Sequence, residues 1–221
     1  MFPALEPGEL HVWSARLTPR EPILSADEVQ RVGGFHSEIH RQRFAAARTI
    51  LRSLLGNYLE IAPSEVEITL GALGKPMVDG LQFNVSHADG LALFAFSLTA
   101  AVGVDLEYIR RLPDMAEMSK RCFSVAEQQA LAVLPDEERD AAFFRGWTRK
   151  EAFLKATGEG IGRGLDYFTV SLDEPARLVH LDHGSSENWT LFHLTVEPGF
   201  VGAAAVQQAG TRLLSLQFCD L

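Results

Sequence analysis

The segment Trp147-Thr-Arg-Lys-Glu-Ala-Phe-Leu-Lys155 predicts a helix with an unusual face. Four residues spaced four apart would share one side of that helix: Phe143, Trp147, Glu151 and Lys155. An amphipathic helix normally keeps its buried face apolar and turns its charges away from the core. Here Glu151 follows two aromatic residues onto partly buried ground, where a carboxylate is costly unless a cation holds it. The pattern fits either an exposed Glu–Lys pair or a functional site.

The pattern outside this segment predicts a mixed α+β fold. Capping residues and helical spacing indicate helices at 25–33, 37–60, 124–134 and 137–157. Apolar alternation indicates strands at 10–17, 65–70, 83–85, 91–96, 101–107, 167–172, 189–197 and 200–207. Residues 65–107 and 167–207 share an element order, so we expect two similar α+β lobes, residues 1–103 and 104–221. A cleft between such lobes is a natural ligand site.

Composition narrows the class of protein. With 47% hydrophobic and 22% charged residues, the chain resembles an ordinary soluble globular protein. The net charge of −9 argues against a nucleic-acid-binding surface. Cys122 and Cys219 have neither disulfide-framework nor zinc-site spacing. The apolar run at 91–104 is shorter than the roughly 20 residues of a membrane helix, and the N-terminus lacks signal-peptide features. We therefore expect a cytoplasmic protein without membrane association.

Two carboxylates lie two residues apart on the strand predicted at 101–107. Asp105 and Glu107 would face the same side of that strand. Such oxygen ligands suit Mg²⁺, which uses one or two carboxylates together with waters and substrate phosphates. An exposed acidic strand face is the simpler alternative for this pattern alone.

A third group of residues offers donors to an anion. Lys75 lies in the turn Gly74-Lys-Pro76, and Ser86 and His87 begin a second turn. Ser86, His87 and Asp89 do not form a hydrolase triad, because close sequence neighbours cannot adopt the nucleophile–base–orienter geometry.

Taken together, these segments resemble the 4'-phosphopantetheinyl transferases of the surfactin-synthetase-activating type. The family motifs occur in order as Phe83-Asn-Val-Ser-His87, Gly103-Val-Asp-Leu-Glu107 and Trp147-Thr-Arg-Lys-Glu-Ala-Phe-Leu-Lys-Ala-Thr-Gly-Glu-Gly160. The resemblance spans roughly residues 40–205 and includes the helix around Arg48. Ala88 departs from the family pattern, in which a small hydroxyl residue is common.

The resemblance implies a function, a fold and a set of site residues. Enzymes of this family move the phosphopantetheine arm of coenzyme A onto a carrier-protein serine, releasing 3',5'-ADP, and have a pseudo-twofold pair of α+β lobes. The resemblance implies a Mg²⁺ site at Asp105, Glu107 and Glu151. It implies a nucleotide and phosphate site at Arg48, Lys75, Ser86 and His87, with Pro76 shaping the turn near the base. Glu151, directly or through a metal-bound water, would be the general base, and Lys155 would neutralise the leaving phosphate.

The segment after the strand at 101–107 is a possible dock for the carrier protein. Basic residues alternate there with apolar ones: Arg110, Arg111, Lys120 and Arg121 with Leu112, Met115, Met118 and Phe123. A basic rim around an apolar centre is typical of an interface, although a solvated connector would look similar. Two lobes in one chain predict that a monomer suffices.

Two other functions remain open from the sequence. A regulatory module that binds coenzyme A without catalysis would not need the complete set of carboxylates. A Mg²⁺-dependent pyrophosphate hydrolase could use the same carboxylates, but it would leave the basic and apolar segment without a role.

Overall fold

The structure is a computed structural model that describes residues 2–71, 73–159 and 164–218. Its first half contains β1 (Glu9–Arg16), α1 (Ala26–Gly33), α2 (Glu38–Leu59), β2 (Thr69–Leu70), β3 (Pro76–Met77), β4 (Gln82–Ala88) and β5 (Leu91–Ser97). Its second half contains β6 (Val102–Tyr108), α3 (Met115–Cys122), α4 (Val125–Ala132), α5 (Asp136–Thr157), β7 (Phe168–Val170), β8 (Leu178–Leu181), β9 (Thr190–Leu194), β10 (Phe200–Val206) and β11 (Arg212–Gln217). The predicted α+β class is confirmed.

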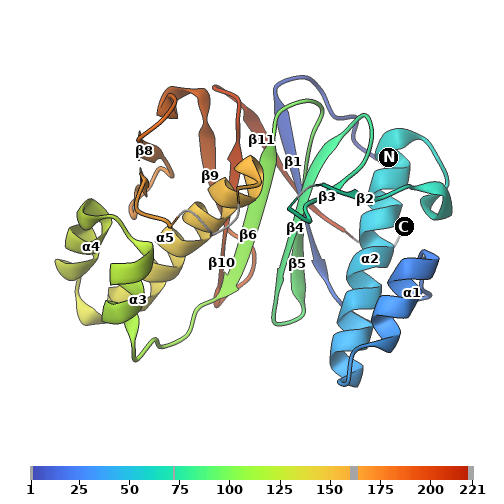
Figure 1. Ribbon diagram of the computed structural model, residues 1–221, viewed down its shortest axis with the longest axis horizontal. Coiled ribbons are helices and arrows are strands. Elements are labelled where there is room, and N and C mark those ends of the chain that lie inside the picture. The colour runs from blue at the N-terminus through green and yellow to red at the C-terminus, as the bar shows by residue number, and fades with distance from the viewer. Residues whose placement is uncertain (1, 72, 160–163, 219–221) are drawn as a thin grey trace.

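The two halves repeat one topology. In each, a first strand is followed by a 22-residue helix, α2 or α5, then by a short two-stranded ribbon and a hairpin. The first strand then pairs antiparallel with the last, giving the orders β1-β5-β4 and β6-β10-β9. Figure 1 shows the two sheets meeting in the middle of the molecule, with α2 and α5 on either side. The prediction of two similar lobes is confirmed, and we call them the N-terminal lobe (β1–β5) and the C-terminal lobe (β6–β10).

The last strand crosses back to the first sheet. β11 pairs in parallel with β1, so residues 212–217 complete the sheet of the N-terminal lobe. A division of the chain at residue 103 stays a prediction, and this pairing is a contact that crosses it. We did not predict β11 from the sequence.

Two further differences from the sequence-based expectations are local. The strand expected at 65–70 is limited to Thr69–Leu70, with Glu65 at the end of a 3-10 turn and residues 66–68 outside any regular element. A helix, α3, lies in the segment of the possible carrier dock, where we predicted neither a helix nor a strand.

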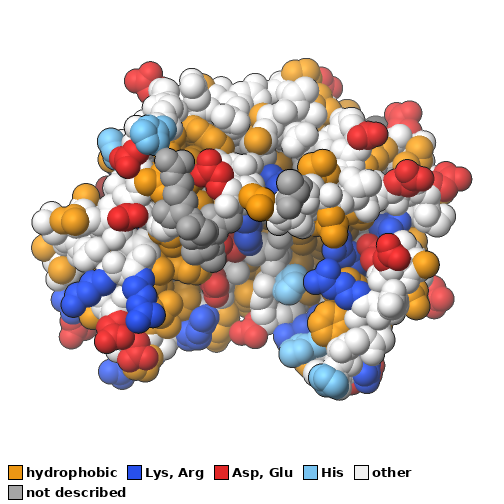
Figure 2. Space-filling view, in the orientation of Figure 1, with side chains coloured by type: hydrophobic (Ala, Val, Ile, Leu, Met, Phe, Trp, Pro, Cys, Tyr) orange, Lys and Arg blue, Asp and Glu red, His pale blue; other side chains and the backbone are white. Residues whose placement is uncertain are grey.

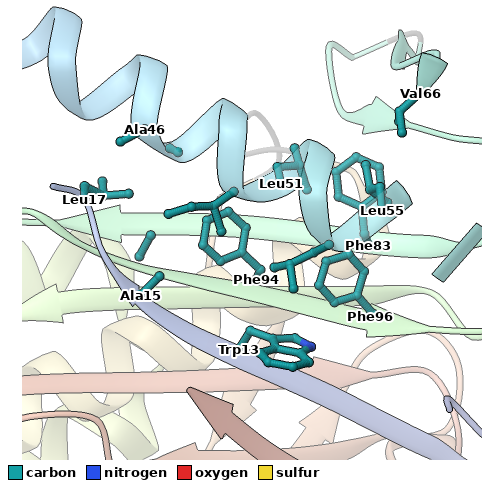
Figure 3. Close-up of a cluster of buried hydrophobic side chains, with 14 of the residues drawn as sticks. Trp13, Ala15, Leu17, Ala46, Leu51, Leu55, Val66, Phe83, Phe94 and Phe96 are labelled. Carbon is teal, nitrogen blue, oxygen red and sulfur yellow. The ribbon is translucent and has the colours of Figure 1, made fainter. Parts of the chain in front are cut away.

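The core of the N-terminal lobe lies between α2 and its sheet. Figure 3 shows Trp13, Leu51, Phe94 and Phe96 directed into the space between the helix and the strands, and all four are buried. Burying such side chains stabilises the fold by roughly 1.5–3 kcal/mol each. This packing fixes the position of α2 and therefore of the arginines that it carries.

No helix in the part of the chain that the structure describes combines the length and apolarity of a membrane span.

Candidate functional site

The two lobes meet along β4 and β6, which belong to different sheets but lie side by side (Figure 1). The backbone N–H of Val104 on β6 donates a hydrogen bond of 3.0 Å to Oδ1 of Asn84 on β4. A side-chain amide therefore joins the two sheets directly before Asp105. Our reading of the sequence assigned no role to Asn84.

A close approach of β6 and α5 brings the acidic and basic residues together. A Cβ atom at Gly103 would lie 2.0 Å from the Ala152 carbonyl oxygen and 2.4 Å from the Ala156 nitrogen. Both atoms belong to the backbone of α5 and cannot rotate away. Only glycine at this position lets the strand lie against the helix, with Asp105 next to Lys155.

A hydrogen-bonded network spans the joint between the lobes. The Lys155 Nζ atom lies 2.6 Å from Asp105 Oδ1, 3.0 Å from Ser86 Oγ and 3.2 Å from the Val104 carbonyl oxygen. Ser86 Oγ in turn donates to Asp105 Oδ1 at 2.9 Å. Residues predicted from three separate motifs are thus in contact.

The other two predicted carboxylates surround this network. Burial, followed by the charge of Asp105, raises the pKa of Glu151, with Lys155 opposing the shift. Burial also raises the pKa of Glu107, partly opposed by a hydrogen bond from Arg110 at 3.3 Å. Like charges that raise one another's pKa values in this way would be relieved by a bound cation.

The structure gives mixed support to a metal centre here. Within the described residues, no group of three or more His, Cys, Asp or Glu side chains is arranged to hold a metal ion. However, Asp105 Oδ2 and Glu151 Oε1 are both buried without a hydrogen-bond partner among those residues. Two partnerless carboxylate oxygens are hard ligands that favour a cation. The donor chemistry therefore fits Mg²⁺, although Asp105, Glu107 and Glu151 are not arranged as a three-residue metal site in this structure.

A cavity of about 400 Å³ lies in the N-terminal lobe next to the network. Of the predicted nucleotide-site residues, Arg48, Pro76 and His87 line it. The pKa of His87 is lowered, first by burial and then by the charge of Lys155. Figure 2 shows Lys, Arg and His side chains gathered along this side of the hollow between the lobes.

The same cavity includes residues that we did not single out. Its other lining residues include Arg31, Phe35, Phe44 and Phe83. The Phe44 ring lies 5.4 Å from the guanidinium carbon of Arg31 and 5.4 Å from that of Arg48. A cavity with apolar walls and two guanidinium groups at its edge suits a nucleotide base that carries phosphates. Arg31 is the only basic residue of α1, so no spacing within that helix pointed to it.

Lys75 lies in a second cavity, of about 260 Å³, which Glu151 and Lys155 also line. Its ammonium donates to the carbonyl oxygens of Val102 and Ala156, each at 3.2 Å. Burial lowers the pKa of Lys75. In this arrangement Lys75 connects the β2–β3 turn of the N-terminal lobe with the C-terminal lobe.

The predicted stripe on α5 runs from the core into the joint between the lobes. Phe143 is buried and stacks on half-buried Trp147 at a ring distance of 6.4 Å, and Glu151 and Lys155 follow on the same face. Gly158 ends the helix in the left-handed conformation, as we expected. Gly160, the last residue of this motif, lies outside the described residues.

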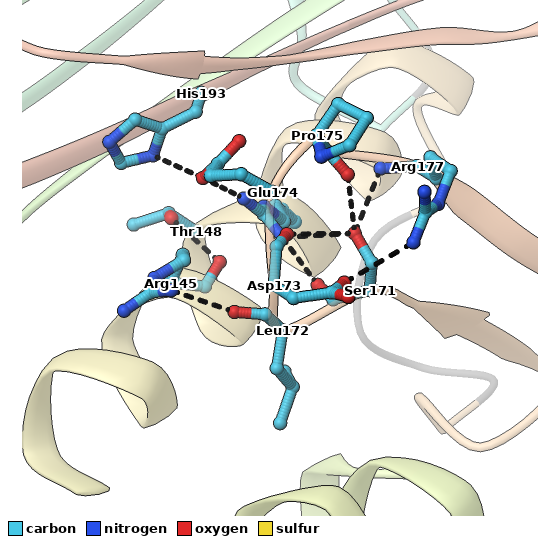
Figure 4. Close-up of polar contacts among 10 residues, drawn as sticks. Arg145, Thr148, Ser171, Leu172, Asp173, Glu174, Pro175, Arg177 and His193 are labelled. Carbon is cyan, nitrogen blue, oxygen red and sulfur yellow. Dashed lines mark hydrogen bonds and ion pairs between the residues drawn. The ribbon is translucent and has the colours of Figure 1, made fainter. Parts of the chain in front are cut away.

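The two remaining basic residues of the motif point away from the site. Lys150 is fully buried and donates to the carbonyl oxygens of Leu165 and Phe168, with Glu127 as its ion-pair partner at 3.0 Å. Arg149, also fully buried, donates to the Ser171 and Asp173 carbonyl oxygens and pairs with Glu174. Figure 4 labels these three partners, which lie close together. Both residues tie α5 to the chain that follows it.

The predicted carrier dock is only partly at the surface. Phe123 is 2% exposed and stacks on Phe143, so the expectation that it lies at the centre of an exposed patch is wrong. Met115 and Met118 on α3 are half-buried. The basic residues of the segment are all exposed: Arg110, Arg111, Lys120 and Arg121.

Comparisons with known proteins agree with the motifs. A family model described as the 4'-phosphopantetheinyl transferase superfamily matches residues 101–207. The chain is 40% identical to the 4'-phosphopantetheinyl transferase HetI of Nostoc sp. PCC 7120, over 91% of this chain and 89% of that protein. It is 32% identical to the 4'-phosphopantetheinyl transferase psf-1 of Bacillus pumilus, over 70% and 66% of the two chains. It is 26% identical to the 4'-phosphopantetheinyl transferase Sfp of Bacillus subtilis, over 71% and 70%.

Replacing Gly103 with alanine tests the close approach of β6 and α5. We expect Gly103→Ala to lower the free energy of unfolding by more than about 3 kcal/mol, because backbone atoms on both sides prevent relief of the clash. Gly33→Ala is the matched control, since a Cβ there meets no atom within 4 Å. Urea unfolding followed by circular dichroism measures both. Equal stability of the two variants would show that β6 can move away from α5.

Proposed function

The chain belongs to the 4'-phosphopantetheinyl transferase superfamily, and from that premise we propose a Mg²⁺-dependent transfer in which Glu151 is the base. The family reaction moves the phosphopantetheine arm of coenzyme A to a serine of an apo carrier protein and releases 3',5'-ADP. This chain is an enzyme of that class. The metal, the roles of individual residues and the carrier surface are our proposals.

Coenzyme A would bind with its nucleotide end in the cavity of the N-terminal lobe. Phe35, Phe44 and Pro76 offer apolar contacts for the adenine ring of coenzyme A. Arg31, Arg48 and His87 provide donors for phosphate oxygens at the edge of the same cavity. The pyrophosphate would then extend toward the joint between the lobes, where Ser86 and Lys155 lie.

Asp105, Glu107 and Glu151 would hold the metal ion. When bound, Mg²⁺ would neutralise charge on the pyrophosphate oxygens as the phosphorus–oxygen bond breaks. One oxygen of Asp105 and one of Glu151 have no hydrogen-bond partner in the described part of the chain, which supports this assignment. Ser86 orients the Asp105 carboxylate through their 2.9 Å hydrogen bond.

Glu151 would remove the proton of the carrier serine. The serine oxygen attacks the β-phosphorus of coenzyme A, forming a phosphodiester, and the bond from this phosphorus to the bridging oxygen breaks. The bridging oxygen leaves with 3',5'-ADP, and the serine proton passes to Glu151. Glu151 lines the cavity beside the joint together with Lys155, and its buried Oε1 has no hydrogen-bond partner among the described residues, so this oxygen is open to a substrate proton. Lys155, one helical turn later on α5, is close enough to the joint to meet charge on the leaving phosphate.

The observation that carries this proposal is the contact of Ser86, Asp105 and Lys155 beside Glu151. These residues come from β4, β6 and α5 and therefore from both lobes. The nucleotide cavity and the cavity lined by Glu151 share Asn84 and Val85, which precede Ser86 on β4, and Lys155 lines the second cavity.

Intact-mass analysis of carrier proteins tests the reaction. The protein would be incubated with coenzyme A, Mg²⁺ and apo carriers of fatty-acid, polyketide and nonribosomal-peptide type. We expect one carrier to gain a single phosphopantetheine arm, and none to gain it when the metal is chelated. Release of 3',5'-ADP without a carrier would instead support a pyrophosphate hydrolase.

Glu151→Gln removes the proposed base while keeping the size of the side chain. We expect kcat for carrier modification to fall by roughly 10²–10⁴-fold, the usual contribution of a general base. Glu137→Gln, at an exposed position in the first turn of the same helix, is the control and should keep full activity. Single-turnover kinetics with saturating coenzyme A give the comparison. Normal turnover by Glu151→Gln would refute its role as base.

The exposed basic residues around α3 are our candidate surface for the carrier. Arg111 and Lys120 are exposed next to half-buried Met115 and Met118, which together form a charged edge beside apolar side chains. A carrier with an acidic face would match this edge locally, although the whole chain is acidic. Arg110 is less suitable as a probe, because it also pairs with Glu107.

Reversing two of these charges tests the surface. For Arg111→Glu combined with Lys120→Glu, we expect a higher KM for the carrier, a weaker dependence of KM on salt and an unchanged KM for coenzyme A. Arg177→Glu, a reversal at another exposed arginine of the C-terminal lobe, is the control. A carrier KM equal to that of the control would remove the surface from the proposal.

A further inference from the structure

The Lys155 ammonium has no hydrogen-bonding capacity left for a substrate. A lysine ammonium has three donors, and here they engage Ser86 Oγ, the Val104 carbonyl oxygen and Asp105 Oδ1. All three acceptors belong to the protein. Lys155 can therefore contact a phosphate only after it gives up one of these bonds.

The Asp105 carboxylate is engaged through only one of its two oxygens within the described residues. Its Oδ1 accepts from both Lys155 and Ser86, while its Oδ2 is buried without a partner among the described residues. The Asp105 side chain is only 8% exposed, so water replaces these contacts poorly. The ammonium of Lys155 is then the cation that makes this buried carboxylate tolerable.

A divalent ion on Asp105 and the ammonium at its present distance would repel each other. Two positive unit charges 4 Å apart already repel each other by an amount that shifts an equilibrium about fivefold under full water screening, and the effect is larger in a buried site. The side chain of Lys155 has space to move, because it is 30% exposed and lines the cavity of about 260 Å³ together with Glu151.

We propose that Lys155 is the built-in counter-cation of Asp105 in the metal-free enzyme, and that metal binding displaces its ammonium from Asp105 toward the cavity beside Glu151. The inference rests on the proposed metal site at Asp105. In this exchange, the metal takes the place of the Lys155 ammonium at Asp105, and the ammonium becomes free to contact the leaving phosphate. A lysine that merely braced the fold would have no such link to the metal.

Mn²⁺ binding to the protein without coenzyme A tests the exchange, with titration calorimetry as the readout. We expect Lys155→Met to bind Mn²⁺ about fivefold more tightly than the wild type or better, since the competing charge is gone. Lys75→Met is the matched control. It removes an ammonium from the same cavity, but that ammonium contacts only carbonyl oxygens and no carboxylate. Its Mn²⁺ affinity should rise clearly less than that of Lys155→Met, because the Lys75 ammonium contacts no carboxylate that the metal would take over.

A second measurement uses the unaltered protein, so it does not depend on the folding of a variant. Acetic anhydride labelling followed by peptide mass spectrometry reports how free each lysine amine is. We expect Mg²⁺ or Mn²⁺ to speed the labelling of Lys155 but not that of Lys75.

Other outcomes separate this inference from the proposed function. Equal Mn²⁺ affinity in Lys155→Met and the wild type, or equal tightening in Lys75→Met, would overturn the exchange. If Asp105→Asn nevertheless abolished Mn²⁺ binding, the proposed metal site would stand. Absence of Mn²⁺ binding to the wild type and to Lys155→Met would also overturn the exchange, while the metal dependence of carrier modification would still test the function.

Discussion

The contact between β6 and α5 is the constraint on which the site depends. Because Gly103 has no side chain, the strand lies against the backbone of the helix at Ala152 and Ala156. Asp105, two residues further along the strand, then reaches Lys155 of the helix. A larger residue at position 103 would separate the acidic strand from the basic end of the helix. The close contact with α5 therefore requires glycine at the first position of the motif Gly103-Val-Asp-Leu-Glu107.

The duplicated topology gives the two lobes different chemistry on one frame. In the N-terminal lobe, α1 carries Arg31 and the long helix α2 carries Arg48 to an apolar cavity. In the C-terminal lobe, the equivalent helix carries Glu151 and Lys155 toward the acidic strand β6. The joint between the lobes thus lies between a region suited to phosphates and one suited to a cation. Asn84 and Ser86 on β4 connect the two lobes, Asn84 through one hydrogen bond with β6 and Ser86 through hydrogen bonds with Asp105 and Lys155.

Much of this arrangement could be predicted from spacing alone. The four-residue interval on α5 predicted one face for Phe143, Glu151 and Lys155, because helix geometry is local. What could not be predicted depends on contacts between distant segments. Nothing in the sequence near Lys155 indicates that its donors engage Ser86 and Asp105, and nothing near Phe123 indicates that Phe143 covers it. Lys150 and Arg149 belong to the same motif as Glu151 and Lys155, yet their carbonyl and carboxylate partners lie elsewhere in the C-terminal lobe.

The return of β11 to the first sheet also affects synthesis of the chain. One edge of β1 has its parallel partner only in residues 212–217, about two hundred positions later. During synthesis, this edge of the N-terminal sheet therefore stays open until residues 212–217 have emerged from the ribosome. The sheet of the N-terminal lobe is thus complete only after the strands β6–β10 of the C-terminal lobe have been made.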